Sequence, residues 1–240
     1  MDKKLLGKVI QYLEKEEYKV HSVYLTGSRA YGFHTEESDY DLVAFVLPTQ
    51  EDVLLGKKFV SVVRKPNLLM VEEVAVKDVR YLLDFLKKPS FNSLFMLDEP
   101  LYLNGKNFFS KEESLESFYA NSPNFLNSLA GIYQQRLNRS SKAGTYEQRS
   151  ANHSSKNRAH ALFLAKVYKA FCEGEDFRKV DVTDCLKVRN KEKKYSLEPM
   201  LPFLSPREHT SDLLREHQEK LEKTFVKAFK ETLFGGCENA

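Results

Sequence analysis

Two aspartates, Asp39 and Asp41, are the residues whose type and spacing point most directly to chemistry. They stand at the start of an apolar run that reads as a strand, and residues i and i+2 of a strand lie on one face, about 7 Å apart. Two carboxylates this close repel each other and resist ionising. A hard divalent cation would neutralise them, and ligands that are all oxygens suit Mg²⁺ or Mn²⁺. The pair therefore predicts a metal site.

A turn at Gly27 and Ser28 precedes the aspartates, with ten residues between Ser28 and Asp39. The preceding apolar strand stops abruptly there, so the turn leaves backbone N–H groups and the Ser28 hydroxyl facing solvent. Such a turn ahead of a helix start suits the phosphates of a nucleotide, and Arg29 adds a charged donor. A phosphate site beside a metal site is the equipment for phosphoryl or nucleotidyl transfer.

The arrangement G-S-x(10)-D-x-D resembles that of the nucleotidyltransferase superfamily of the DNA polymerase β type. The longer string G-S-R-A-Y-G, followed by S-D-Y-D, is similar to one branch, the predicted nucleotidyltransferases linked to RNA repair in bacteria and phages. The resemblance implies an enzyme that moves an NMP from an NTP to an acceptor hydroxyl and releases pyrophosphate. Gly27, Ser28 and Arg29 would then hold the triphosphate.

The resemblance also implies a third carboxylate on a later strand, which would help hold the catalytic metal and draw the proton from the attacking hydroxyl. The candidates are Glu72 and Glu73, and adjacent residues of a strand cannot share a face. The family's spacing to the following helix favours Glu73, and Glu72 stays open as the alternative.

A further similarity lies in Lys156 and His160, which match the family's K-x-x-x-H helix and would contact the triphosphate or the substrate. This sequence has Phe163 where the family often carries an arginine, so that charge is either missing or supplied by Arg158. The alternative is structural, because residues i and i+4 of a helix can simply border its apolar stripe.

The elements that must position these residues fall into an α/β half and a helical half. Apolar periodicity predicts strands at 20–26, 40–47, 59–63, 68–76 and 101–103, and helices at 5–13, 77–88, 114–137, 154–172 and 206–233, the last stopped by Gly235-Gly236. A polar loop is expected at 139–150. The fold class is α+β, with a small mixed-sheet nucleotidyltransferase domain at 1–105 and a helical substrate-binding or nucleotide-binding domain at 106–240.

Composition excludes several classes of protein. Hydrophobic residues make up 42% of the 240 residues and charged residues 30%, which suits a packed domain and not a disordered chain. The sequence has no apolar run of the length a membrane span needs and no signal-peptide pattern. Its three cysteines include no C-x-x-C pair, which argues against a disulfide framework or a zinc site. We expect a cytoplasmic protein that does not act on membranes.

A basic stretch of the sequence is relevant to the identity of the acceptor. Residues 134–169 contain eight lysines and arginines and one acid, Glu147. The stretch is either a solvated face or a surface that faces phosphate, and its interleaved aromatic residues could stack bases. An RNA acceptor, such as a tRNA or another RNA 3′ end, fits this stretch. A protein hydroxyl, as in nucleotidylating toxins and antitoxins, and a non-catalytic nucleotide-binding or RNA-binding module are the alternatives.

Overall fold

A computed structural model describes residues 1–59, 62–142, 149–192 and 211–234, apart from the side chains of 141–142, 149–153 and 211–213. The chain forms two compact units. Unit 1 comprises Met1–Ala30, Asp39–Asn121 and His209–Ala240, and unit 2 comprises Tyr31–Ser38 and Ser122–Glu208. Each unit is considered by itself below.

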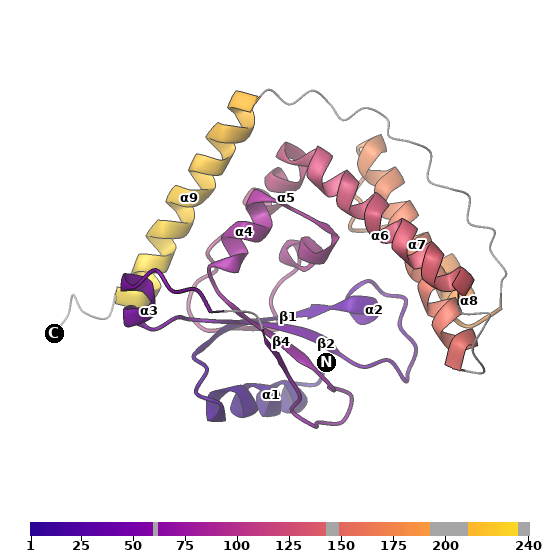
Figure 1. Cartoon of the computed structure of the whole chain (residues 1–240), viewed down its shortest axis with the longest axis horizontal. Helices are drawn as coiled ribbons and strands as arrows, with labels where there is room; N and C mark the ends of the chain where they lie inside the picture. The colour runs from indigo at the N-terminus through magenta and orange to yellow at the C-terminus, as the bar shows by residue number, and fades with distance from the viewer. Residues whose placement is uncertain (60–61, 143–148, 193–210, 235–240) are drawn as a thin grey trace. The chain divides into compact units, whose positions relative to one another are not determined.

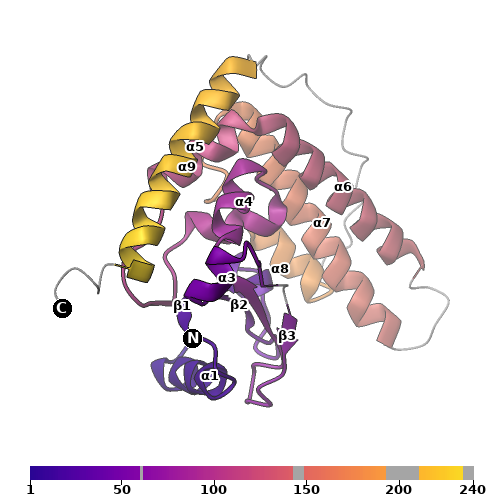
Figure 2. The same cartoon turned by 60° about the vertical axis from the view of Figure 1, so that its left-hand side comes forward.

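Unit 1 is built on a five-stranded mixed sheet with the order β3-β4-β2-β1-β5. β2 and β4 are parallel, and the other neighbouring pairs are antiparallel. Figure 1 shows the central strands β1, β2 and β4, and Figure 2 shows β3 at one edge. The strands are β1 Val20–Thr26, β2 Asp41–Val46, β3 Val62–Arg64, β4 Val74–Asp78 and β5 Tyr102–Leu103.

One face of the sheet is covered by α1 (Lys3–Lys15). Asp2 caps this helix by accepting a hydrogen bond from the Lys4 backbone N–H at 3.2 Å, as N-cap aspartates commonly do. Val9 and Leu13 are fully buried one helical turn apart, so a single stripe of α1 faces the sheet. This helix was predicted from the same apolar spacing.

The opposite face carries a second core, to which segments distant in the sequence contribute. These segments are α4 (Tyr81–Lys87), the 3₁₀ helix η1 (Phe91–Leu97), α5 (Lys111–Ala120) and α9 (Ser211–Phe234). Phe45 on β2 and Phe95 on η1 pack with their ring centroids 5.8 Å apart. From α9 come Leu221, Phe225 and Phe229, all buried in this core. The C-terminal helix is therefore part of the sheet's hydrophobic core.

Unit 2 is helical and contains α6 (Ser122–Lys142), α7 (Arg149–Glu173) and α8 (Thr183–Arg189). α6 and α7 lie side by side, with α8 against α7, in both Figure 1 and Figure 2. Phe125, Phe171 and Phe177 form a ring cluster with centroids 5.0–5.6 Å apart. These rings and the fully buried Leu129 and Leu164 make the core of the unit.

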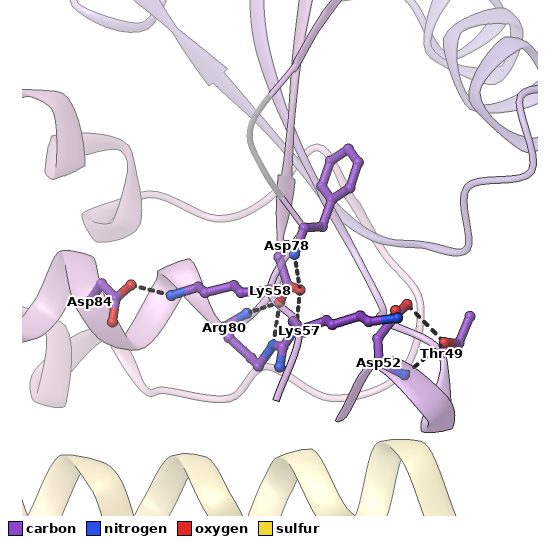
Figure 3. Close-up of polar contacts among 8 residues, drawn as sticks. Thr49, Asp52, Lys57, Lys58, Asp78, Arg80 and Asp84 are labelled. Atoms are coloured by element: carbon purple, nitrogen blue, oxygen red, sulfur yellow. Dashed lines mark hydrogen bonds and ion pairs between the residues drawn. The ribbon is translucent and has the colours of Figure 1, made fainter. Parts of the chain in front are cut away.

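A buried carboxylate anchors the end of β4 in unit 1 (Figure 3). The Asp78 side chain has no exposed surface and accepts hydrogen bonds from the backbone N–H groups of Phe59 and Arg80, at 3.2 and 2.8 Å. The Arg80 guanidinium donates to both Asp78 oxygens, at 2.9 and 2.6 Å, and to the Lys57 carbonyl. Asp78 and Arg80 therefore tie the segment 57–59 to the end of β4.

The predicted fold class, α+β with a mixed-sheet nucleotidyltransferase domain and a helical C-terminal region, is confirmed. Several boundaries differ from those expected. The strand expected over 68–76 begins only at Val74, because Asn67 and Met70 adopt positive φ angles and turn the chain. Lys77 and Asp78 finish β4, so the helix expected from 77 starts at Tyr81.

The helix expected over 114–137 is two helices. It breaks at Asn121, whose side chain bonds back to the Ser117 carbonyl at 3.1 Å, and Pro123 suits the first turn of α6. Four short helices were not predicted: α2 (Gly27–Ala30), α3 (Gln50–Leu54), η1 and α8. Positions 60–61 of an expected strand, positions 143–148 of the expected loop at 139–150, the helix start at 206 and its stop at 235–236 lie outside the described residues. The rest of that expected loop is helical, because 139–142 end α6 and 149–150 begin α7.

The domain boundary expected near residue 105 stays a prediction. The compact units divide the chain differently, because α5 and α9 pack with α4 and η1 beside the sheet. Cys172 and the buried Cys185 are free thiols, and Cys237 lies outside the described part of the chain.

Candidate active site

The turn that was expected to bind phosphate is present at the end of β1. β1 ends at Thr26, and Gly27 begins α2 with a φ angle of +69°, in the left-handed region that favours glycine. α2 is only four residues long, so the donors at this turn are its local backbone N–H groups and the half-buried Ser28 hydroxyl. The positive φ angle explains why glycine stands at this position.

Asp41 lies directly against this turn. The antiparallel ladder pairs Asp41 with Thr26, and the Thr26 hydroxyl donates to the Asp41 carbonyl at 3.1 Å. A Cβ atom added to Gly27 would stand 1.9 Å from Oδ2 of Asp41 and 2.7 Å from its Cγ. The carboxylate therefore occupies the space that any side chain at position 27 would need. The glycine and the aspartate that the sequence pattern singled out are brought together by the register of β1 and β2.

Asp39 is exposed like Asp41, but it lies outside the strand. The strand expected over 40–47 begins at Asp41, so strand alternation does not by itself place the two carboxylates on one face. Two contacts hold the intervening Tyr40 in place, one to its backbone and one to its ring. Its backbone N–H donates to the Met70 carbonyl at 2.7 Å, and the Arg29 guanidinium lies 4.3 Å from the centroid of its ring. Arg29 is thus placed beside the segment that carries both aspartates.

Glu73 is in register with Asp41 along the parallel ladder. Leu42 pairs with Val74, so Glu73 and Asp41 are the residues that immediately precede one registered pair. Val43 and its partner Ala75 lie on the face that packs on α4 and α9, and two-residue alternation within β2 gives Asp41 that same face. Glu72 and Glu73 precede β4, so strand alternation does not by itself place their side chains. Glu73 is exposed and forms an ion pair of 3.3 Å with Lys65.

The donor set fits a hard cation only in part. Asp39 and Asp41 offer exposed carboxylate oxygens, the ligand type that Mg²⁺ and Mn²⁺ prefer. Among the residues that the structure describes, no three His, Cys, Asp or Glu side chains are gathered closely enough to hold a metal ion. The third carboxylate is thus not assembled with the other two, although the ladder brings Glu73 into line with Asp41.

Lys156 and His160 belong to α7 of unit 2, and the structure separates their environments. Lys156 is exposed and lines a pocket of about 800 Å³. His160 is largely buried, with its ring 5.6 Å from that of Phe33 and 6.3 Å from that of Tyr31. Burial, and then the charges of Arg136, Lys156 and Arg189, lower the pKa of His160 to about 3. His160 is therefore neutral at physiological pH and does not add positive charge for a phosphate.

The pocket beside Lys156 includes residues that the sequence pattern did not single out. His34, Glu36 and Glu37 come from the segment that precedes Asp39, and Arg189 and Lys191 come from the end of α8. These groups are remote from one another in sequence, so no local spacing could have revealed the pocket.

The α/β part of the chain is similar to a known family of domains. Residues 6–102 match the family model described as a nucleotidyltransferase domain. The match covers the sheet of unit 1 together with Gly27, Ser28, Arg29 and all of the carboxylate candidates. It stops before α5 and the helices of unit 2. The α/β part of the chain is thus classed with nucleotidyltransferase domains.

A solved structure is also similar, a nucleotidyltransferase-like protein from Exiguobacterium sibiricum 255-15. It is 11% identical, and the match covers 99% of this chain and 80% of that chain with a TM-score of 0.31. A likeness this weak supports no statement about fold or function. No curated protein matches the chain. No helix among the described residues is long and apolar enough to cross a membrane.

Proposed function

We propose that this protein is a metal-dependent nucleotidyltransferase that moves an NMP from an NTP to an acceptor hydroxyl, with an RNA end as acceptor. The single observation that supports the proposal is that the Asp41 carboxylate packs directly against the α-carbon of Gly27. A carboxylate held against a phosphate-binding turn puts metal and phosphate at one place, which is what this transfer requires.

The roles of the residues follow from their places on the strand ends. Backbone N–H groups at Gly27 and the Ser28 hydroxyl would donate to the β- and γ-phosphates, with the Arg29 guanidinium beside them. Asp39 and Asp41, helped by Glu73, would hold Mg²⁺ or Mn²⁺, which when bound neutralises phosphate charge and stabilises the entering and leaving oxygens.

In this proposal the acceptor hydroxyl oxygen forms a bond to the α-phosphorus while the bond to the β-phosphate bridging oxygen breaks, so pyrophosphate leaves. Because Glu73 immediately precedes Val74, the partner of Leu42, and Glu72 lies one residue further from that pair, the hydroxyl proton passes to the Glu73 carboxylate. Its ion pair with Lys65 would have to open first, and both side chains are more than half exposed, so this costs little.

The basic stretch at 134–169 supports an RNA acceptor, as in the RNA-repair branch that the sequence resembles. Lys156 serves as a substrate contact in this proposal, and the neutral His160 holds its place on α7 by packing against Phe33. A cytoplasmic location is the setting that such a substrate implies.

The test is to incubate the protein with each of the four α-labelled NTPs, Mg²⁺ or Mn²⁺, and a total cell lysate. We expect label in the RNA fraction and pyrophosphate in solution, and neither with Asp39→Asn plus Asp41→Asn. Label in protein would replace the RNA acceptor with a protein one. No transfer to any fraction would leave a binding module and overturn the proposal.

A further inference from the structure

Unit 2 contains a second polar site, in the pocket of about 800 Å³ that Lys156 lines. This volume is within the range of about 300–1,000 Å³ typical of ligand sites. Its charged or titratable lining residues come from three segments: His34, Glu36, Glu37, Lys156, Arg189 and Lys191. All of these segments belong to the same compact unit.

The charge of this lining favours a singly charged anion. Lys156, Arg189 and Lys191 carry three positive charges, and Glu36 and Glu37 carry two negative charges. A surplus of one positive charge suits a phosphodiester, which carries one negative charge. The four negative charges of an NTP would meet two carboxylates in the same pocket, and like charges disfavour binding.

Two of the cations that line the pocket also act on His160 of α7. Burial, and then the charges of Arg136 on α6, Lys156 and Arg189, lower the pKa of His160. The Arg136 guanidinium donates to the neutral side chain of Asn157 at 3.1 Å, and Asn157 is only 3% exposed. An anion in the pocket would partly neutralise Lys156 and Arg189.

His34 lines the pocket and carries one buried polar atom. Nδ1 of His34 is buried, and among the described residues it has no hydrogen-bond partner. A buried polar atom without a partner costs free energy. His34 belongs to the segment that leads into Asp39, because Glu37 precedes Asp39 by two residues.

We infer that this pocket holds a backbone phosphate of the RNA acceptor strand. This inference rests on the proposed function for the identity of the acceptor, but not for the binding itself. The lysine and arginine side chains would contact the phosphate, and the carboxylates would exclude the more highly charged triphosphate. The charge of the pocket thus favours the acceptor strand over the nucleotide.

The test measures binding without turnover. Fluorescence anisotropy with a labelled single-stranded RNA of 12 nucleotides, in EDTA and without NTP, gives the Kd and its salt dependence. We expect Arg189→Gln to weaken binding about tenfold and to lower the salt slope by about one unit, as the loss of one charged phosphate contact does. Glu36→Gln plus Glu37→Gln should tighten RNA binding.

A matched control exists on the same helix. Lys187 is exposed on α8 and does not line the pocket, so Lys187→Gln removes the same charge and should change the Kd less than twofold. Lys156→Gln, at an exposed position on another helix, repeats the measurement in case Arg189→Gln fails to fold. Binding of Mg²⁺-NTP is measured in parallel and should not change in Arg189→Gln or Lys187→Gln.

Two outcomes overturn the inference. If Arg189→Gln and Lys187→Gln weaken RNA binding equally, only the general positive charge of α8 matters. If the pocket variants lower the affinity for Mg²⁺-NTP and not for RNA, the pocket serves the nucleotide. Failure of the proposed function is a separate result, because a protein that binds RNA in this pocket but transfers no NMP still passes the binding test.

Discussion

The Asp41 carboxylate and the α-carbon of Gly27 are so close that no side chain fits between them, since a Cβ at Gly27 would stand 1.9 Å from Oδ2 of Asp41. The pairing of Thr26 with Asp41 across β1 and β2 enforces this closeness. The turn at Gly27 and the Asp41 carboxylate are consequently in direct contact, and a change in either is transmitted to the other.

Gly27→Ala should therefore do more than block a phosphate. The new Cβ must displace the Asp41 side chain, and φ of +69° is strained for alanine. We expect NMP transfer to fall at least a hundredfold and the free energy of unfolding to fall by about 1–2 kcal/mol. Pyrophosphate release and urea denaturation measure the two effects.

Gly131→Ala is the control for that substitution. Gly131 lies inside α6, and a Cβ there meets nothing within 4 Å, so alanine should raise stability by up to about 1 kcal/mol. The collision itself is isolated by repeating Gly27→Ala in an Asp41→Ala background, where the stability cost should shrink. An unchanged cost in that background would show that the backbone angle alone is responsible.

The two aspartates should be dispensable for folding and required for turnover. Both are exposed, so Asp39→Ala plus Asp41→Ala should leave the Tm without metal unchanged or slightly higher. Native protein should gain Tm with Mg²⁺ and NTP, because ligand that binds only the folded state stabilises it. The double variant should show no such gain and no pyrophosphate release. Native turnover by this variant is incompatible with the proposed mechanism.

The sequence predicted the parts of the fold whose apolar residues follow a clear local pattern. β1 was predicted with its observed bounds, and α1 and β2 nearly so, because β1 and β2 are short apolar runs with turn or polar residues beyond them and α1 repeats apolar residues at helical spacing. η1 was missed because Phe91 and 94–97 form a nearly continuous apolar run without helical periodicity. The strand expected over 68–76, which is β4, was extended too far toward its start because nothing in local propensity signals a positive φ angle at Met70.

Some of the candidate site residues could likewise be predicted from the sequence, and others could not. Gly27 and Asp41 could be paired from the sequence because both lie at the ends of strands that pair locally. The pocket in unit 2 could not, since His34 and Lys156 are brought together only by tertiary packing. The neutrality of His160 was also beyond the sequence, because it depends on burial against Phe33.

Asp78 should contribute far more to the free energy of unfolding than the half-exposed Asp84 on α4. Asp78→Asn leaves the largely buried Arg80 guanidinium without its carboxylate, so we expect the free energy of unfolding to fall by about 3 kcal/mol or more. Asp84 pairs with Lys58 but is half exposed, so Asp84→Asn should cost less than about 1 kcal/mol. Urea denaturation of both variants checks the contrast. Equal losses would contradict the structural role of Asp78.

His21 should make stability fall in acid. The ring is 1% exposed, stacks on Phe108 with centroids 4.4 Å apart, and lies 3.2 Å from the Lys106 carbonyl. That hydrogen bond requires a proton on Nε2, so Nδ1 accepts from the Ser22 hydroxyl. Burial lowers the pKa of His21 to about 4, although the bond to the Lys106 carbonyl opposes the shift.

The unfolded chain takes up a proton on His21 near pH 6.5, and the folded chain does not. The contribution of the neutral His21 to the free energy of unfolding is therefore complete above pH 6.5. It is lost as the pH falls toward 4, and amounts to about 3 kcal/mol over that interval. His21→Gln should flatten the dependence of the unfolding free energy on pH between 6.5 and 4. His160, whose pKa burial lowers to about 3, also contributes to the pH dependence of stability over this interval, but it remains in both proteins, so the difference between the two curves belongs to position 21.

The place of α9 in the sheet's core sets a condition on how the molecule is made. Leu221, Phe225 and Phe229 complete the core around Phe45 and Phe95, although residues 6–102 alone match the nucleotidyltransferase domain. On the ribosome, that core stays incomplete until α9 has been synthesised. The part of the chain that carries Gly27 and Asp41 is made well before α9, yet its core can close only once Leu221, Phe225 and Phe229 have followed.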